Sequence, residues 1–200
     1  MALFEKAYKE TCENEGGYSN HPSDKGGETY KGIARKHWPK WAGWIIIDSL
    51  KGKEFMSGHW TKQLSGNSNL NELVKDFYKE EYWNKLSCIH LPQDISNELF
   101  DTSVNMGKYY GACCLQMALN KLNRNQKDFS DLIVDGQIGS KTIEAIEAYK
   151  GTERFSSRNS EKLINWLLKW MNYFQLKKYD LITEKDQGQE VFIPGWTERG

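Results

Sequence analysis

The strongest constraint on the fold is an apolar pattern with helical spacing near the end of the chain, from Ser160 to Leu181. Apolar side chains recur there every three or four residues, which is the spacing of one face of an α-helix. The pattern covers much of the circumference because it contains Leu163, Trp166, Leu167, Trp170, Met171 and Phe174. A helix that is apolar on most sides is normally buried. We therefore expect this segment to be the central core helix of a helical domain.

Most other segments also have helical spacing. It predicts helices over 3–14, 70–84, 110–122 and 140–149, one more beginning near Pro92, and an aromatic helical stretch from Ile33 to Lys51 that breaks at Pro39. Residues 18–32 are rich in Gly, Pro and turn formers, which indicates a loop with at most a short β-excursion. The predicted fold class is mainly α, with little or no β-sheet and two closely packed lobes, 1–88 and 89–200.

Composition excludes several classes of protein. The 200 residues carry no formal net charge, whereas broad nucleic-acid binding needs a basic surface. The longest apolar run, Trp44 to Ile47, is far shorter than the roughly 20 residues that a membrane span requires. The four cysteines lack the spacing of a zinc site and are expected to be buried thiols. We expect a monomer without metal or cofactor, with no nucleic-acid partner and no membrane span.

The candidate chemistry begins with Glu15, which follows the first predicted helix and precedes Gly16 and Gly17. The negative end of a helix dipole disfavours ionisation of a carboxyl group, and a protonated carboxyl is what a general acid supplies. Asp24 and Thr29 follow in the loop, and glycoside hydrolysis generally uses two carboxylates. On spacing alone, a surface glutamate, a turn-forming aspartate and a capping threonine explain the same pattern.

An ordered motif adds specificity. Glu15-Gly16-Gly17-Tyr18, followed by Asn20, Pro22, Asp24, Gly26-Gly27, Thr29 and Gly32-Ile33, resembles the N-terminal signature of glycoside hydrolase family 108, which contains bacterial and phage N-acetylmuramidases. The second half resembles the predicted peptidoglycan-binding region that accompanies this enzyme domain, through Asp101, Val104, Asn105, Gly107, Leu115-Gln116, Ala118-Leu119, Asp135-Gly136, Ile138-Gly139, Thr142, Gly195-Trp196 and Arg199. The resemblance therefore covers nearly the whole chain.

The resemblance implies a lysozyme-like, mainly helical muramidase that cleaves the β-1,4 bond after N-acetylmuramic acid in peptidoglycan, without a cofactor. It places Glu15 at the catalytic glutamate. Asp24 and Thr29 match, more loosely, the Glu, Asp, Thr order of phage-type lysozymes. His21 stands where the family often has Asp, and Tyr30-Lys31 replaces a commoner Asn-aromatic pair. Glu28 therefore remains a rival for the second carboxylate.

Further candidates have two interpretations each. Tyr18 and Tyr30 either stack on sugar rings or pack the loop against the core. Asp101 and Asn105 share a helix face and either line the substrate cleft or belong to a buried polar network. Trp38, Trp41 and Trp44 are more typical of core packing than of a sugar platform.

Two other functions fit the same residues. A lytic transglycosylase also uses one glutamate but releases a 1,6-anhydro sugar. A non-catalytic wall-binding or secretion-assisting protein would need no acid at Glu15. The N-terminus lacks the pattern of a signal peptide, so we expect an enzyme that acts on the cell wall after cytoplasmic storage, as phage endolysins do, or after export by another route.

Overall fold

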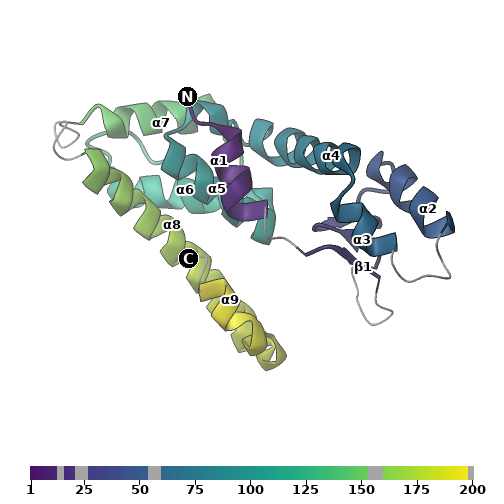
Figure 1. Ribbon diagram of the computed structural model, residues 1–200. Coiled ribbons are helices and arrows are strands. Elements are labelled where there is room, and N and C mark those ends of the chain that lie inside the picture. Colours follow the sequence, from purple (N-terminus) through teal and green to yellow (C-terminus); the bar gives the residue numbers. More distant parts are fainter. Residues whose placement is uncertain (13–15, 21–26, 54–59, 153–159, 198–200) are drawn as a thin grey trace. The chain divides into compact units, whose positions relative to one another are not determined.

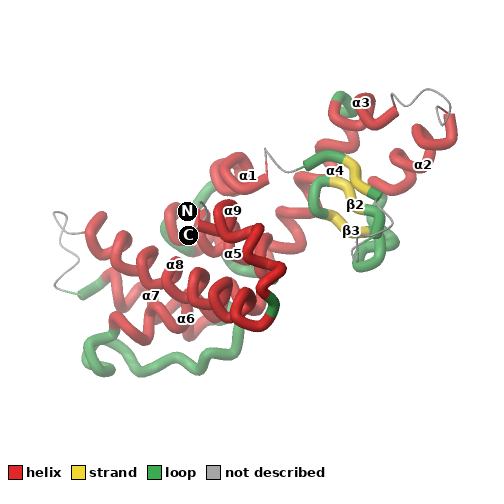
Figure 2. Tube along the Cα trace, turned by 90° about the horizontal axis from the view of Figure 1, so that it is seen from below, coloured by secondary structure: helices red, strands yellow, loops and turns green. Residues whose placement is uncertain are grey.

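The computed structural model describes residues 1–12, 16–20, 27–53, 60–152 and 160–197. Helices dominate this part of the chain, and the strands are only two residues long (Figures 1 and 2). The α-helices are α1 (Phe4–Cys12), α2 (Gly43–Lys53), α3 (Trp60–Ser65), α4 (Ser68–Tyr78), α5 (Gln93–Met106), α6 (Lys108–Leu122), α7 (Ser140–Lys150), α8 (Ser160–Lys185) and α9 (Ile193–Thr197). A π-helical turn η1 (Lys79–Asn84) and the 3-10 helices η2 (Cys88–His90) and η3 (Gln187–Phe192) complete the helical elements. The predicted mainly α fold is confirmed.

The chain divides into two compact units, which we describe separately. The small unit is Tyr8–Glu81, and the large unit combines Met1–Ala7 with Tyr82–Gly200. The predicted assignment of catalysis to residues 1–88 and of wall binding to residues 89–200 stays a prediction.

A three-stranded antiparallel sheet in the small unit follows the first helix. Its strands are β1 (Tyr18–Ser19), β2 (Thr29–Tyr30) and β3 (Ile33–Ala34), in the order β1-β2-β3. Lys31 (φ 43°) and Gly32 (φ 77°) form the two-residue turn between β2 and β3, and two left-handed residues give the turn the twist that suits a hairpin.

The predicted helix from Ile33 to Lys51 is therefore wrong in its first part. The Lys31–Gly32 turn sends Ile33 into a strand, and turns around Pro39 delay helix α2 until Gly43. The aromatic residues of this segment instead form the core of the small unit. Trp41 Nε1 donates to the Leu73 carbonyl (3.3 Å) and Trp44 Nε1 to the Trp38 carbonyl (2.8 Å). Trp44 is buried, whereas Trp38 and Trp41 are half-buried, and these contacts favour the packing interpretation.

The large unit is a helical bundle in which α6 packs against α5 and α8 (Figure 1). Gly107 connects α5 to α6 with φ 88°, a left-handed conformation that glycine adopts without strain. Gly111 then lies against Ser103 so closely that a Cβ at residue 111 would fall 3.1 Å from both Ser103 Cα and Ser103 Cβ. The absence of a side chain at Gly111 thus lets the two helices approach each other.

Helix α8 is buried on one side only, which corrects the expectation of a central helix. Its inward residues include Leu163, Leu167 and Met171, whereas Trp166 and Trp170 are partly exposed and Tyr173 is 48 % exposed. The apolar spacing predicted the helix correctly. It did not reveal that three of the aromatic residues face away from the core.

The loop between α6 and α7 (green in Figure 2) is held by three amide side chains, which we call the amide ladder: Gln116 and Asn120 on α6, and Asn123 at its C-cap. Asn120 accepts from the Leu132 N–H and donates to the Leu132 carbonyl, both at 2.8 Å. Asn123 donates to Asp131 Oδ1 (2.6 Å). The ladder therefore satisfies backbone and side-chain groups that the loop cannot pair within itself.

Gln116 makes the most contacts of the three. Its Oε1 accepts from the backbone N–H groups of Asp135 (3.1 Å) and Gly136 (3.0 Å). Its Nε2 donates to Asp135 Oδ1 (2.8 Å) and to the Gln137 carbonyl (3.0 Å). Donation by Gln116 holds the pKa of Asp135 below its ordinary value. The Asp135-Gly136 turn predicted from the sequence is thus fixed to α6 by one buried side chain.

None of the described helices is both long and apolar enough to cross a membrane. All four cysteines are buried thiols, as predicted.

Candidate active site

The two predicted carboxylates, Glu15 and Asp24, lie outside the described residues, as does His21. The segments that flank them are described. Strand β1 begins at Tyr18, three residues after Glu15, and β2 begins at Thr29, five residues after Asp24. The two strands pair with Tyr18 opposite Tyr30 and Ser19 opposite Thr29. The hairpin therefore brings together the two ends of the segment that contains Asp24.

An ionic cluster surrounds Glu28, the residue that directly precedes β2. The Tyr18 hydroxyl donates to Glu28 Oε1 (2.8 Å), and Arg35 Nε forms an ion pair with Glu28 Oε2 (2.8 Å). Lys51 Nζ lies 3.6 Å from Glu28 Oε1 and donates to the Tyr18 hydroxyl (3.3 Å). The Glu28 side chain is only 15 % exposed, so both of its oxygens are engaged in a partly buried site.

Helix α2 positions both cations of the cluster: it carries Lys51, and its Asp48 and Trp44 contact Arg35. Arg35 forms a bidentate pair with Asp48 (2.6 and 3.0 Å), and its guanidinium lies 4.3 Å from the centre of the Trp44 ring. The hydrogen bond to Asp48 is the main cause of a raised pKa at Arg35, and the bond to Tyr18 is the main cause at Lys51. Both cations therefore stay charged, and their positive charges lie next to the Glu28 carboxylate.

Burial, followed by the hydrogen bond to Glu28, raises the pKa of the Tyr18 hydroxyl. The Tyr18 ring also contacts Trp60 edge to face at 4.6 Å. Tyr18 is half-buried, so part of its ring remains accessible. Its hydroxyl is engaged in the cluster, and Lys51 Nζ lies over its ring at 5.8 Å from the centre, so a ligand could contact only the part of the ring that these neighbours leave exposed.

Tyr30 is in a different position. Its side chain is 1 % exposed, and its ring stacks on Trp41 at 6.4 Å. Burial raises the pKa of its hydroxyl, which has no hydrogen-bond partner among the described residues. Of the two interpretations of Tyr30, burial of the ring favours packing of the hairpin against the core over stacking on a sugar.

Thr29 is half-buried in β2, opposite both Ser19 and Ala34. Asp101 and Asn105 belong to the large unit. On α5 the Asn105 amide donates to the Asp101 carbonyl (2.8 Å) and to Asp101 Oδ2 (3.1 Å). Asp101 is half-buried and Asn105 is exposed, and the choice between their two interpretations stays a prediction.

Sequence reasoning did not find Arg35, Asp48 or Lys51. No motif marks them, because Arg35 and Lys51 matter through their contacts with Glu28, and Asp48 through its contact with Arg35. Within the described ranges, no group of three or more His, Cys, Asp or Glu side chains is placed to hold a metal ion.

Comparisons with known proteins find two family models that together cover most of the chain. A family model described as Glycosyl hydrolase 108 matches residues 8–107, and a model described as Predicted Peptidoglycan domain matches residues 110–200. Among solved structures, SagA of Brucella abortus is similar, with 26 % sequence identity and a TM-score of 0.55 over 98 % of this chain and 88 % of that chain. No curated protein matches.

Proposed function

The chain belongs to the glycosyl hydrolase 108 family, and on that premise we propose that it cleaves the β-1,4 bond after N-acetylmuramic acid in the glycan strands of peptidoglycan. Membership makes it a glycosidase, and the matching peptidoglycan domain directs that activity to the cell wall. The bond cleaved and the residues that cleave it are the proposal.

In the proposed mechanism Glu15 protonates the glycosidic oxygen of the leaving sugar. Asp24 stabilises the positive charge that develops on the ring or activates water, and Thr29 positions that water. The motif supports the assignment of Glu15, since it matches the family's catalytic glutamate and comes directly before the hairpin. The two glycines after Glu15 have no side chains to obstruct a polymeric substrate.

The observation that best supports Asp24 is the state of its rival. Glu28 accepts a hydrogen bond from Tyr18 and forms ion pairs with Arg35 and Lys51, so both of its oxygens are already engaged. A carboxylate held in this way cannot turn toward a sugar without breaking a partly buried ionic cluster. We therefore assign Glu28 to the support of the hairpin and Asp24 to the reaction.

The test is digestion of purified peptidoglycan by the wild type and by three isosteric variants, Glu15→Gln, Asp24→Asn and Glu28→Gln, with reducing sugar and product masses as readouts. We expect Glu15→Gln to lose at least about a hundredfold in rate and Asp24→Asn a comparable amount. Glu28→Gln should keep activity within about fivefold at a temperature where it is folded. Full activity of Glu15→Gln would overturn the mechanism.

Product masses separate the alternative functions. Hydrolysis leaves a reducing N-acetylmuramic acid, which is heavier by one water than the 1,6-anhydro product of a transglycosylase. A wall-binding protein without activity would pellet with the wall and release no sugar. Either of these two outcomes would contradict the proposed hydrolysis.

A further inference from the structure

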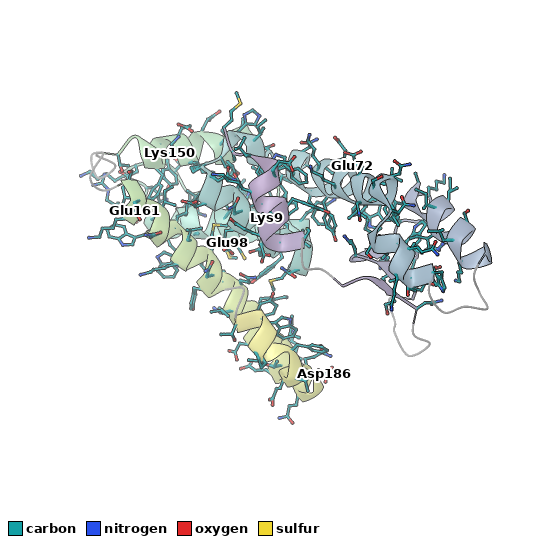
Figure 3. The ribbon with its side chains drawn as sticks, viewed as in Figure 1. Lys9, Glu72, Glu98, Lys150, Glu161 and Asp186 are labelled. Carbon is teal, nitrogen blue, oxygen red and sulfur yellow. The ribbon has the colours of Figure 1, made fainter. Side chains whose placement is uncertain are left out.

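An open aromatic groove lies on the outer side of α8 in the large unit. Its volume is about 590 Å³, and it is lined by Leu122 of α6 and by Trp166, Lys169, Trp170 and Tyr173 of α8. In Figure 3, Glu161 and Asp186 mark the two ends of the helical run that carries it. None of these residues has a part in the mechanism proposed above.

The tryptophans of this groove differ from those of the small unit. Trp41 and Trp44 both donate their indole N–H to backbone carbonyls, as expected of tryptophans that serve packing. Trp166 and Trp170 are partly exposed, and neither indole N–H donates to another residue in the described ranges. Each therefore offers both an apolar face and a polar edge to a ligand.

Two of the three rings, those of Trp170 and Tyr173, are also held in place before any ligand arrives. Trp170 contacts Tyr173 edge to face at 5.5 Å and Phe174 at 5.9 Å, and Phe174 is anchored in the core with 9 % exposure. Along the helix axis, Trp166 and Trp170 are about 6 Å apart and Trp170 and Tyr173 about 4.5 Å apart. A pre-ordered row of rings loses little conformational entropy on binding.

The charges beside the rings indicate the kind of ligand. Lys169 lines the groove, and Lys162 Nζ lies 5.4 Å from the centre of the Trp166 ring. Aromatic faces suit the C–H faces of pyranose rings, and ammonium groups suit carboxylates. Peptidoglycan presents both groups together, because its sugars carry stem peptides, attached through the lactyl group of muramic acid, that have free carboxylates. The groove also lies wholly within the residues that match the peptidoglycan domain.

We propose that the groove formed by Leu122, Trp166, Lys169, Trp170 and Tyr173 is a binding site for the glycan strand of peptidoglycan. The rings stack on successive sugars, and Lys169 pairs with a carboxylate of the stem peptide that the muramic acid unit carries. The site anchors the enzyme on the wall and takes no part in bond cleavage. The inference rests on the proposed function only for the identity of the polymer.

The test measures binding separately from cleavage, using the full-length chain throughout. Cosedimentation with purified peptidoglycan sacculi at 4 °C gives the affinity for wall. Calorimetry with a soluble GlcNAc-MurNAc-peptide fragment and with chitohexaose distinguishes charged from neutral glycans. Trp166→Ala and Trp170→Ala should each weaken sacculus binding about tenfold, and Trp170→Phe should stay within about twofold of the wild type.

A pair of lysine variants tests the carboxylate contact. Lys169→Glu should weaken binding of sacculi and of the muramic acid fragment about fivefold while leaving chitohexaose binding unchanged. Lys185→Glu makes the same charge change about 24 Å further along α8 and should have no effect. Circular dichroism and the midpoint of thermal unfolding verify that each variant is folded.

The outcomes keep the two proposals apart. Wild-type sacculus binding by folded Trp166→Ala and Trp170→Ala variants overturns the groove assignment, whether or not the chain digests wall. If these variants keep wall binding but lose self-association in ultracentrifugation, the groove binds a second copy. If they keep wall binding but lose flotation with phosphatidylglycerol vesicles, it binds a lipid surface. In both cases the assignment is wrong. Wall binding that depends on Trp170 in a chain that digests no wall contradicts the proposed function and supports the groove.

Discussion

Arg35 contacts Glu28 twice, through its side chain and through its backbone. Arg35 Nε lies 2.8 Å from Glu28 Oε2, and the Arg35 N–H donates to the Glu28 carbonyl at 2.8 Å. The residue before β2 and the residue after β3 are thereby joined across the hairpin. The turn and the ionic cluster stabilise each other, and this separates the role of Glu28 from that of a catalytic carboxylate.

The ion pair of Arg35 with Glu28 should contribute more to stability than its ion pair with Asp48, which a comparison of Arg35→Ala with Asp48→Ala measures. Arg35→Ala leaves the Glu28 carboxylate, which is 15 % exposed, without its closest cation, and should lower the free energy of unfolding by about 2–3 kcal/mol. Asp48→Ala removes the 53 % exposed partner and should cost less than about 1 kcal/mol. Urea unfolding followed by tryptophan fluorescence measures both. Equal costs would show that the partly buried pair has no special role.

The buried hydroxyl of Tyr30 predicts a harmless substitution. Since it has no hydrogen-bond partner among the described residues, Tyr30→Phe removes a desolvated polar group and keeps the ring on Trp41. The free energy of unfolding should stay the same or rise by up to about 1 kcal/mol, and peptidoglycan digestion should be unchanged. A large loss of activity in a stable variant would mean that the hydroxyl contacts substrate.

Glu98 on α5, labelled in Figure 3, makes the stability of the large unit depend on pH. Burial raises its pKa from 4.5 to about 7, assisted by Asp101 on the same helix and opposed by the hydrogen bond from Thr102. The Asn172 amide of α8, with its nitrogen toward Glu98, lies 3.1 and 3.2 Å from the carboxyl oxygens.

The unfolded chain ionises Glu98 near pH 4.5, whereas the folded chain ionises it near pH 7. The free energy of unfolding should therefore fall between these pH values, by up to about 3 kcal/mol from this group. Glu98→Gln should remove that fall, so that it equals the wild type near pH 4 and exceeds it at pH 8. Urea unfolding across this range is the measurement, and parallel pH profiles would contradict the assignment.

The amide ladder predicts a strong effect at Gln116. Gln116→Leu leaves the N–H groups of Asp135 and Gly136 without their acceptor and should lower the free energy of unfolding by about 2–4 kcal/mol. Gln126→Leu, in the same connection, replaces a side chain whose only hydrogen bond within the described ranges is a 3.5 Å bond from the Asp131 N–H, and should cost less than about 0.5 kcal/mol. Amide hydrogen exchange at residues 135 and 136 should accelerate only in the first variant.

Two glycine-to-alanine changes should have opposite signs. Gly111→Ala forces α6 away from Ser103 and should destabilise the large unit by about 1–3 kcal/mol. Gly52, in α2, has no neighbour within 4 Å of an added Cβ, so Gly52→Ala should stabilise the chain by about 0.5–1 kcal/mol. Thermal unfolding of the two variants measures both, and two shifts of the same sign would contradict the packing described for Gly111.

Helical spacing was enough to predict helices α5 to α8 of the large unit, because each has one face that must be buried. It was misleading at Ile33, where a turn of two left-handed residues reversed the chain before the aromatic side chains could form a helix. Spacing also could not separate inward Leu167 from partly exposed Trp170, since both are apolar.

The candidate site was predictable only as a motif. The order of residues around Glu15 and Asp24 indicated the chemistry, and the matched family agrees with it. The support of the hairpin by Arg35 and Lys51 was not predictable. Arg35 is 7 positions from Glu28 in the sequence and Lys51 is 23 positions away, and contacts at these separations have no local signature.

Contacts of Leu3 and Phe4 constrain when the large unit can fold during synthesis. Leu3 exchanges hydrogen bonds with the Gln93 side chain (2.6 and 3.1 Å), and the Phe4 ring packs on Trp83 and Phe100. At a ribosomal rate of about 5–20 residues per second, these partners are made roughly 5–20 s after Leu3. Residues 1–7 of the large unit therefore remain without these packing partners until the small unit has been translated.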